Sequence, residues 1–301
     1  MRYHVSVRWA PRPAPLVLAF SAIYALCFTA IKAGLRFAPP LLFAGLRILI
    51  GGAAILAILA VSRRPLLPDR AIWPWIAALA ATTAVTYAAM FLSPGRTSAG
   101  IASVLGNLQP LLVIVLAAAF LGEQVSRREI YALALALGGV TLIAAPALVG
   151  PAGYGVPGAA LALMASAGAA GGSLIMKRMA QPGIVLLVTA WQLLLGSLPL
   201  LLAAALVERG HAVNWDPAFV ALLVFLGVGG TALPTAGWFW LLQGHDVGRL
   251  SLFLFLVPLF GLAIATVAFA EPVRASEGAG TLLTLAGIVL MAGDRQPAAH
   301  H

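Results

Sequence analysis

Long uninterrupted runs of apolar residues restrict the fold of this chain more than any other feature. Residues 111–121 and 252–270, for example, contain no charged side chain. A helix that crosses a bilayer needs about 20 mostly apolar residues, and strands of a membrane barrel would instead alternate apolar and polar residues. The runs therefore predict an all-α integral membrane protein with ten transmembrane helices. The predicted segments are Pro15–Leu35, Leu41–Val61, Ile72–Leu92, Gly100–Leu121, Ile130–Leu148, Pro157–Met176, Gly183–Val207, Ala218–Leu242, Gly248–Ala270 and Gly278–Gly293.

The composition excludes a soluble protein. Apolar residues make up 62% of the chain and charged residues 9%, whereas soluble domains are about 45–50% apolar and about 25% charged. The same figures exclude a cytosolic enzyme or a nucleic-acid-binding domain, although Lys and Arg outnumber Asp and Glu by 18 to 9. The expected surroundings are the lipid bilayer, and no nucleic-acid partner is expected.

The basic residues are distributed unevenly between the two sides of the predicted bundle. The side that holds both termini and the even-numbered connections carries 12 Lys and Arg, and the other side carries 5. Because cytoplasmic loops of membrane proteins are enriched in Lys and Arg, we expect a multi-pass protein of the inner (plasma) membrane with both termini in the cytoplasm.

The two halves of the chain carry the same pattern of residues. Lys32 and Lys177 each end an apolar run, and Arg47 and Gln192 each follow 15 residues later, so that both pairs are 145 positions apart. The pattern predicts a first repeat over 1–149, a Gly/Pro-rich connection over 150–158 and a second repeat over 159–301.

A second set of matching residues lies further along each half. Pro110 is followed 13 residues later by Glu123, and Pro258 is followed 13 residues later by Glu271, at an offset of 148. Because each half contains an odd number of predicted helices, the second half must enter the membrane from the opposite face. Such inverted-topology repeats are common in secondary transporters, which bind substrate near the membrane midplane.

On these residues the chain resembles the ten-helix branch of the drug/metabolite transporter superfamily, which has two EamA-type repeats. The resemblance rests on the two Pro-Glu pairs, whose glutamates lie in Leu121-Gly122-Glu123 and Ala270-Glu271-Pro272, and on the basic residue Arg47, which Gln192 replaces in the second half. It implies export of amino acids, related metabolites or drugs, with the aromatic amino-acid exporters as the expected branch. It also implies that the fifth and tenth predicted helices are peripheral.

The predicted segments lack buried acids. All nine Asp and Glu residues and all five His residues lie in connections or at segment ends. This pattern disfavours proton coupling through an intramembrane carboxylate, and it offers neither a metal site nor an activated nucleophile. We therefore expect no enzyme activity, no catalytic residues, no cofactor and no metal. Glu123 and Glu271 are expected to cap neighbouring helices or to pair with loop arginines.

The remaining polar and aromatic side chains within the segments are candidates for a substrate cavity. They are Ser21, Tyr24, Thr86, Tyr87, Met90, Asn107, Ser166, Trp191, Gln192, Trp238 and Phe253. An amide in hydrocarbon needs either a partner or a wet cavity, so Asn107 and Gln192 either line the cavity or bond to a neighbouring helix. The aromatic rings offer flat surfaces to a ligand, with core packing or lipid contact as the alternative.

Three further residues have more than one interpretation. Arg47, about two turns inside its segment, could bind a substrate carboxylate, or it could bond to nearby carbonyls or anchor at the interface. Pro110 and Pro258 remove a donor from the carbonyls of Gly106 and Leu254. Those carbonyls could accept an ammonium group or water, or the prolines could serve as kinks for packing or gating.

The sequence thus predicts a small-metabolite exporter that works by alternating access. Its central cavity is expected to be largely apolar and to lie among the first, third, fourth, sixth, eighth and ninth segments, with neutral amino acids, aromatic ones included, as substrates. One alternative is efflux of drugs or quaternary ammonium compounds, which aromatic rings bind by cation–π contact. An alternative of another class is a non-transporting membrane scaffold or receptor.

Overall fold

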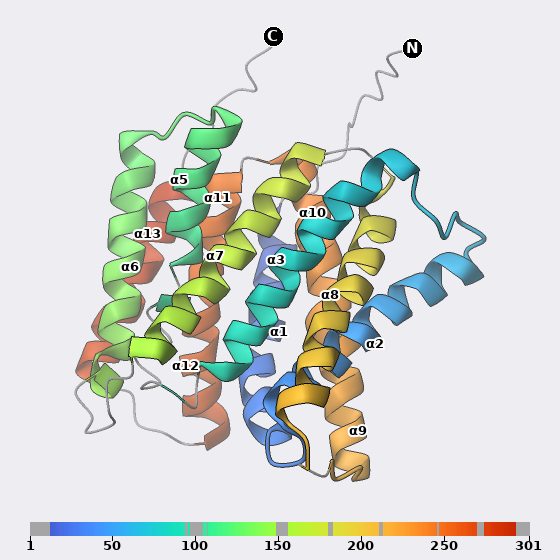
Figure 1. Cartoon of the computed structure of the whole chain (residues 1–301). Coiled ribbons are helices and arrows are strands. Elements are labelled where there is room, and N and C mark those ends of the chain that lie inside the picture. Colours follow the sequence, from blue (N-terminus) through green and yellow to red (C-terminus); the bar gives the residue numbers. More distant parts are fainter. Residues whose placement is uncertain are drawn as a thin grey trace, which may run out of the picture.

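A computed structural model describes residues 13–93, 96, 105–106, 108–148, 156–179, 183–210, 213–245, 247–269 and 274–292 (Figure 1). Within these ranges every regular element is a helix. The first half contains α1 (Pro13–Gly34), α2 (Pro40–Val61), η1 (Arg70–Ile72), α3 (Trp73–Leu92), α5 (Gln109–Leu121) and α6 (Arg127–Leu148). The second half contains α7 (Val156–Met179), α8 (Val185–Val207), α9 (Pro217–Val224), η2 (Phe225–Ala232), α10 (Leu233–Gly244), α11 (Val247–Leu252), η3 (Phe253–Phe255), α12 (Leu256–Phe269) and α13 (Ala275–Ala292).

Helical residues occupy all the predicted segments, but the fourth, eighth and ninth segments are interrupted. Five stretches of the described chain are long and apolar enough to cross a membrane, namely Pro40–Val61, Arg70–Leu92, Val156–Met179, Val185–Val207 and Pro217–Gly244. Shorter apolar helices lie at Pro15–Cys27, Gln109–Leu121, Leu250–Gly261 and Ala275–Leu290. The described chain is therefore an all-helical protein with several membrane-length helices.

Prolines account for the interruptions. Pro110 and Pro258 stand near the starts of α5 and α12, directly after a turn at Leu108 and after the 3-10 turn η3. Pro234 follows the π-helical stretch η2. Proline lacks the N–H that would continue the helical bonding and collides with the carbonyl four residues earlier, so the helix tightens, widens or breaks at that point.

Short polar side chains fix several helix ends. At the start of α6 the backbone N–H of Ser126 donates to Glu129 Oε2 at 2.7 Å, and that of Glu129 donates to Ser126 Oγ at 3.1 Å, forming a capping box. The N–H of Arg274 donates to Glu277 Oε2 at 2.7 Å at the start of α13. The two pairs occupy equivalent positions, 148 residues apart, so the repeat extends to the helix caps.

The helices pack in pairs that join the two halves. The central pairs are α2 with α8 and α3 with α7, while α5 packs on α7 and α1 on α12. The pair formed by α6 and α13 lies at one edge of the molecule (Figure 1). Its close approach depends on glycine, because Gly139 of α6 lies directly against Gly280 and Thr284 of α13.

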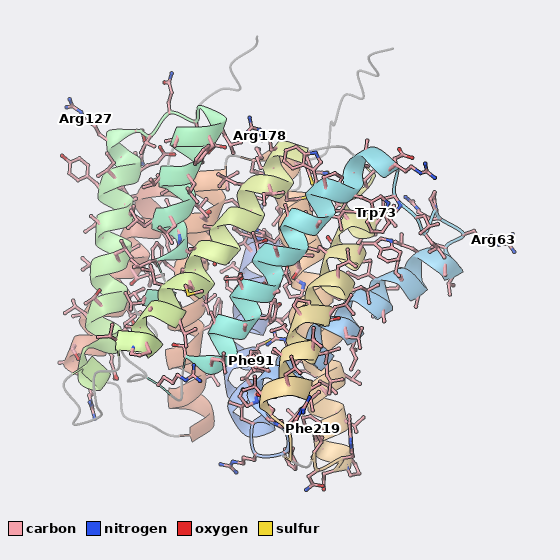
Figure 2. All side chains as sticks on the ribbon, viewed as in Figure 1. Arg63, Trp73, Phe91, Arg127, Arg178 and Phe219 are labelled. Carbon is pink, nitrogen blue, oxygen red and sulfur yellow. The ribbon has the colours of Figure 1, made fainter. Side chains whose placement is uncertain are left out.

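The distribution of side chains is the one expected in lipid. Large apolar side chains on the outer helix faces are exposed, among them Ile58, Val115, Leu202 and Leu282, whereas polar side chains such as Arg47, Gln192 and Thr231 are buried. Arg127 and Arg178 lie at one end of the bundle and Phe219 lies toward the other (Figure 2). Charges therefore gather at helix ends and apolar surface covers the sides.

The α6–α13 contact predicts a position-specific cost of a methyl group. A Cβ at residue 139 would lie 2.5 Å from the carbonyl oxygen of Gly280, whereas one at the neighbouring residue 138 would meet Leu283 Cδ2 at 3.4 Å. We expect Gly139→Ala to reduce stability by about 1–3 kcal/mol, the usual cost of overpacking, and Gly138→Ala to have little effect. Thermal unfolding of the purified protein in detergent tests this, and equal effects of the two substitutions would contradict it.

Candidate functional site

Arg47 lies in the interior of the protein, with 1% of its surface exposed. Its Nε donates to Thr231 Oγ1 at 2.7 Å and its Nη2 donates to the carbonyl oxygen of Gly230 at 3.0 Å. The guanidinium carbon lies 5.4 Å from the centroid of the Tyr87 ring, a cation–π geometry. Within the described chain, Nη1 has no hydrogen-bond partner.

The local sequence of η2 leaves two oxygen atoms free to accept hydrogen bonds from Arg47. Pro234 lies four residues after Gly230 and cannot donate to its carbonyl, which leaves that oxygen available to the guanidinium. The neighbouring Thr231 hydroxyl donates to the carbonyl of Leu226, five residues earlier in η2, at 2.8 Å. The oxygen of Thr231 then has a lone pair for Arg47 Nε, so the irregular helix supplies both acceptors.

Tyr24 and Cys27 of α1 also lie near Arg47 and Gly230. The half-buried Tyr24 side chain lies within electrostatic range of Tyr87, Arg47 and Cys27, and Thr235 is within reach of its hydroxyl. Cys27 is fully buried and lies so close to Gly230 that a Cβ there would overlap its sulfur. We call Tyr24, Cys27, Arg47, Tyr87, Gly230 and Thr231 the Arg47 cluster. It joins α1, α2, α3 and η2.

No carboxylate of the described residues pairs with Arg47. Several of those carboxylates cap helix ends instead: Glu208 accepts the N–H groups of Leu41 and Leu42 at 2.8 and 2.9 Å. Glu123 accepts the N–H of Val247 at 3.3 Å and so caps α11, which confirms the capping role expected of it, while Glu271 lies outside the described residues. A buried charge without an opposite charge is costly in a membrane protein and commonly marks a functional site.

Gln192 lies at the position equivalent to Arg47 and makes an equivalent contact to the other half. It is 1% exposed, and Thr83 Oγ1 donates to its Oε1 at 3.4 Å. The neighbouring Trp191 contacts the connection after α2 and the start of α3: its indole N–H donates to the carbonyl of Leu66 at 2.8 Å and its ring packs edge-on against Trp73 at 5.1 Å.

Ser166 bonds to the interrupted helix just before α5. Its hydroxyl lies 2.8 Å from the carbonyl oxygens of both Leu105 and Gly106. Gly106 is the residue whose carbonyl loses its helical donor to Pro110, so Ser166 of α7 supplies a replacement. Asn107 lies outside the described residues.

The other predicted cavity residues occupy several places. Ser21 on α1 is 1% exposed, and its hydroxyl has no hydrogen-bond partner in the described part of the chain. Met90 packs beside Tyr87 on the apolar core around α2 and α8, and Thr86 donates to the carbonyl of Thr82 at 2.7 Å where α3 crosses α7. Phe253 lies in η3. The structure thus brings Tyr24, Arg47 and Tyr87 together and places Trp191 elsewhere.

The sequence did not predict several of the observed contacts. Trp238 Nε1 donates to Ser173 Oγ at 3.1 Å, and Lys177 Nζ donates to the carbonyls of Leu242 and His245 at 2.8 and 2.6 Å. Gly230 and Thr231 could have been found from the proline argument, because Pro234 frees the Gly230 carbonyl as Pro110 frees that of Gly106. The partners of Ser173 and Lys177 depend on how α7 and α10 pack, which spacing alone does not give.

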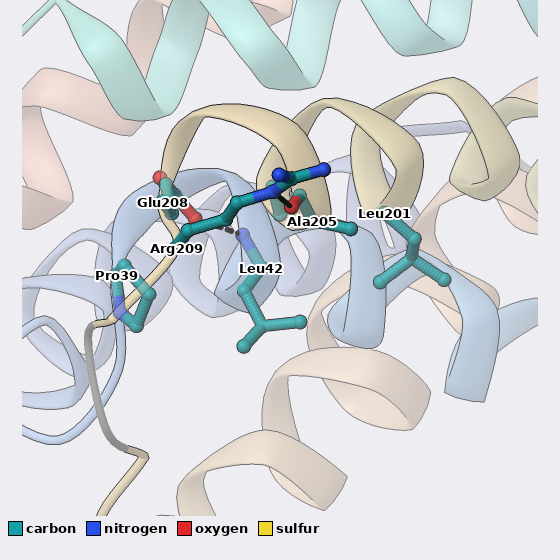
Figure 3. A pocket seen from close by; sticks show the side chains of 7 residues that line it. Pro39, Leu42, Leu201, Ala205, Glu208 and Arg209 are labelled. Atoms are coloured by element: carbon teal, nitrogen blue, oxygen red, sulfur yellow. Dashed lines mark hydrogen bonds between the residues drawn. The ribbon is translucent and has the colours of Figure 1, made fainter.

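A recess of about 240 Å³ opens at a different place, between the start of α2 and the end of α8 (Figure 3). Its lining residues are Pro39, Leu42, Leu201, Ala204, Ala205, Glu208 and Arg209. Glu208 is occupied as a helix cap, and Arg209 Nε donates to the carbonyl of Ala205 at 2.8 Å. The recess shares no residue with the Arg47 cluster, and its polar groups already have partners.

The described residues form a helical integral membrane protein with a buried polar cluster. Two successive stretches of the chain, residues 12–145 and 156–293, match the EamA-like transporter family, and the chain belongs to that family. The resemblance drawn from the Pro-Glu pairs is therefore confirmed.

Several relatives align with most of the chain. The transporter YvbV of Bacillus subtilis (strain 168) is 31% identical over 282 residues, covering 92% of this chain and 90% of YvbV. A protein of Salmonella typhimurium described as a "probable amino-acid metabolite efflux pump" is 30% identical over 286 residues, covering 91% of this chain and 93% of that protein. A solved crystal structure with 20% sequence identity has a TM-score of 0.78 and covers 94% of this chain and 99% of its own, which supports the fold.

The contact between Arg47 and Thr231 predicts energetic coupling. Thr231→Val should be destabilising by about 1–3 kcal/mol, because it leaves a buried charged donor without its acceptor. Arg47→Met removes the charge and the donor together, so Thr231→Val should cost much less in that background. A double-mutant cycle measured by thermal or denaturant unfolding should give a coupling of about 0.5–3 kcal/mol, and additive effects would contradict the contact.

Proposed function

We propose that this protein is an inner-membrane secondary transporter that exports small metabolites, and that its substrates are neutral amino acids, aromatic ones included. Transport proceeds by alternating access between two inverted repeats, with the substrate bound between the halves. Membership of the EamA-like transporter family supports carrier function. The efflux-pump descriptions of relatives from Salmonella typhimurium and Escherichia coli, 30% and 28% identical, support the substrate class.

The Arg47 cluster is the observation that carries the substrate proposal. A guanidinium that is 1% exposed, bonded only to neutral acceptors and with one free nitrogen is suited to a carboxylate, which can accept two parallel N–H bonds. Tyr87 and Tyr24 beside it provide aromatic surface for an apolar or aromatic side chain. Because the guanidinium is enclosed in this structure, substrate reaches it only when the surrounding helices move, as alternating access requires.

The same charge weighs against quaternary ammonium compounds as substrates. A cation placed on the Tyr87 ring would lie near the guanidinium, which already occupies a cation–π position at 5.4 Å. Like charges at such separation in a medium of low dielectric repel strongly. Cation export would therefore need Arg47 to leave the ring.

The proposed orientation follows the basic residues. Arg63, Arg64, Arg70, Arg127, Arg128 and Arg178 lie near one set of helix ends, and Arg36, Arg96, Arg209 and Arg274 near the other. This asymmetry supports a cytoplasmic position for the first set and for both termini.

Counterflow in liposomes that contain only the purified protein tests the function. Vesicles preloaded with unlabelled amino acids should accumulate labelled phenylalanine or tryptophan without an ion gradient, because exchange requires only a carrier that alternates. Empty liposomes and an unrelated membrane protein serve as controls. If amino acids are not taken up but cationic drugs are, the substrates are cationic drugs and not amino acids. If neither is transported, a non-transporting scaffold or receptor is favoured.

Substrate analogues test the role of Arg47. Phenylethylamine lacks the carboxylate of phenylalanine and should compete at least tenfold more weakly, because it cannot use the guanidinium. Arg47→Lys keeps the charge but not the planar pair of donors, so it should weaken phenylalanine competition while leaving phenylethylamine competition unchanged. Equal competition by phenylethylamine and phenylalanine would contradict the role of Arg47 in substrate binding, but not the proposed carrier function.

A further inference from the structure

Two serines occupy equivalent positions in the repeats but have different surroundings. Ser21 on α1 and Ser166 on α7 are 145 positions apart, the same offset as Lys32 and Lys177. Each serine lies on a helix that packs against a broken helix of the other half: α7 packs on α5, and α1 packs on η3 and α12. The prolines at these breaks, Pro110 and Pro258, are also equivalent, at the offset of 148.

Only one of the two serines is engaged. Ser166 is 3% exposed and lies 2.8 Å from the carbonyl oxygens of Leu105 and Gly106. Ser21 is 1% exposed, yet its hydroxyl finds no partner in the described part of the chain. A buried hydroxyl without a partner is unfavourable, so the engaged serine favours this conformation and the unengaged serine opposes it.

A matching acceptor for Ser21 lies in the other repeat. Pro258 has no N–H to donate to the carbonyl of Leu254, just as Pro110 has none for Gly106. Leu254 lies in η3, the turn against which α1 packs. The N–H of Leu256 also points to the Leu254 oxygen, but the helical donor from residue 258 is absent. The carbonyl therefore lies, without that donor, on the element against which the helix of the unpaired Ser21 packs.

We propose that Ser166 and Ser21 are gating residues that engage in alternation. In the conformation described here, Ser166 bonds to the break before α5 and Ser21 is free. In the opposite conformation, Ser21 donates to the Leu254 carbonyl and Ser166 leaves Leu105 and Gly106. Exchange of conformations between inverted repeats gives the two states similar energies, so a single hydrogen bond is enough to shift their populations. This inference rests on the proposed alternating-access transport, but its test requires no substrate.

Double electron–electron resonance between spin labels measures the two helix contacts separately. Leu163→Cys with Val115→Cys reports the distance between α7 and α5, and Leu18→Cys with Ala263→Cys reports the equivalent distance between α1 and α12. All four side chains are exposed and belong to equivalent pairs. Cys27, the one cysteine of the chain, is replaced by alanine in every sample, and the protein is reconstituted in nanodiscs.

The two serine substitutions should shift the populations in opposite directions. Ser166→Ala removes the bond of the present state, so the α7–α5 distances should lengthen and the α1–α12 distances shorten. Ser21→Ala removes the bond available only in the opposite state and should do the reverse. Each change in the population ratio should be about threefold, as a typical side-chain hydrogen bond in a membrane protein provides.

Three further variants complete the test. The double variant Ser21→Ala/Ser166→Ala should return to the ratio of the parent, and Ser166→Thr, which keeps a hydroxyl, should resemble the parent more closely than Ser166→Ala does. Thr141→Ala serves as a control, because the exposed Thr141 hydroxyl donates within its own helix, to the carbonyl of Leu137 at 2.8 Å. Shifts in the same direction for both single variants, or no shift for Ser166→Ala, would overturn the proposal. Failed counterflow combined with opposite shifts would instead overturn only the transport function.

Discussion

Every backbone polar group in an apolar environment needs a hydrogen-bond partner. In the interior of this protein, key contacts between the halves form where a proline deprives a carbonyl of its N–H donor. Pro110 and Pro234 each leave a carbonyl without its helical donor. In both cases a side chain from the other half donates a hydrogen bond to that carbonyl: Ser166 donates to the Gly106 oxygen at 2.8 Å, and Arg47 donates to the Gly230 oxygen at 3.0 Å. Irregular helices are thus points at which the two halves are joined by hydrogen bonds.

The charge on Arg47 adds a second constraint. Removal of a guanidinium from water costs several kcal/mol even when its hydrogen bonds are satisfied, and here the acceptors are a hydroxyl and a carbonyl, each carrying only partial charge. The Tyr87 ring contributes a further electrostatic contact. A side chain this expensive would be replaced by a neutral one if packing were its only role, since apolar residues of similar volume often stabilise a protein as well or better. Its burial without an acid therefore favours a functional requirement for positive charge.

Much of the architecture could be predicted from local pattern. Apolar runs located the helices, the Pro-Glu pairs pointed to the correct family, and the capping of α11 by Glu123 followed from its position after an apolar helix. The site was harder, because it depends on which helix faces meet. Thr231 contacts Arg47 across 184 positions, and nothing in the spacing of either residue indicates the other. Trp191 lies beside Gln192 in sequence but points to Leu66 and Trp73 at a helix end, since adjacent residues on a helix face different directions.

Comparison of the equivalent residues Arg47 and Gln192 separates the scaffold from the site. Both are 1% exposed, and both bond to a threonine of the opposite half, Thr231 or Thr83. The contact is conserved between the repeats while its chemistry is not, because one half contributes a cation and the other a neutral amide. A repeated scaffold allows two conformations of similar energy, whereas identical side chains on both halves would bind a substrate equally in two opposed orientations. The difference between Arg47 and Gln192 thus gives the proposed site a single carboxylate-binding side, while both repeats keep a hydrogen bond to the opposite half.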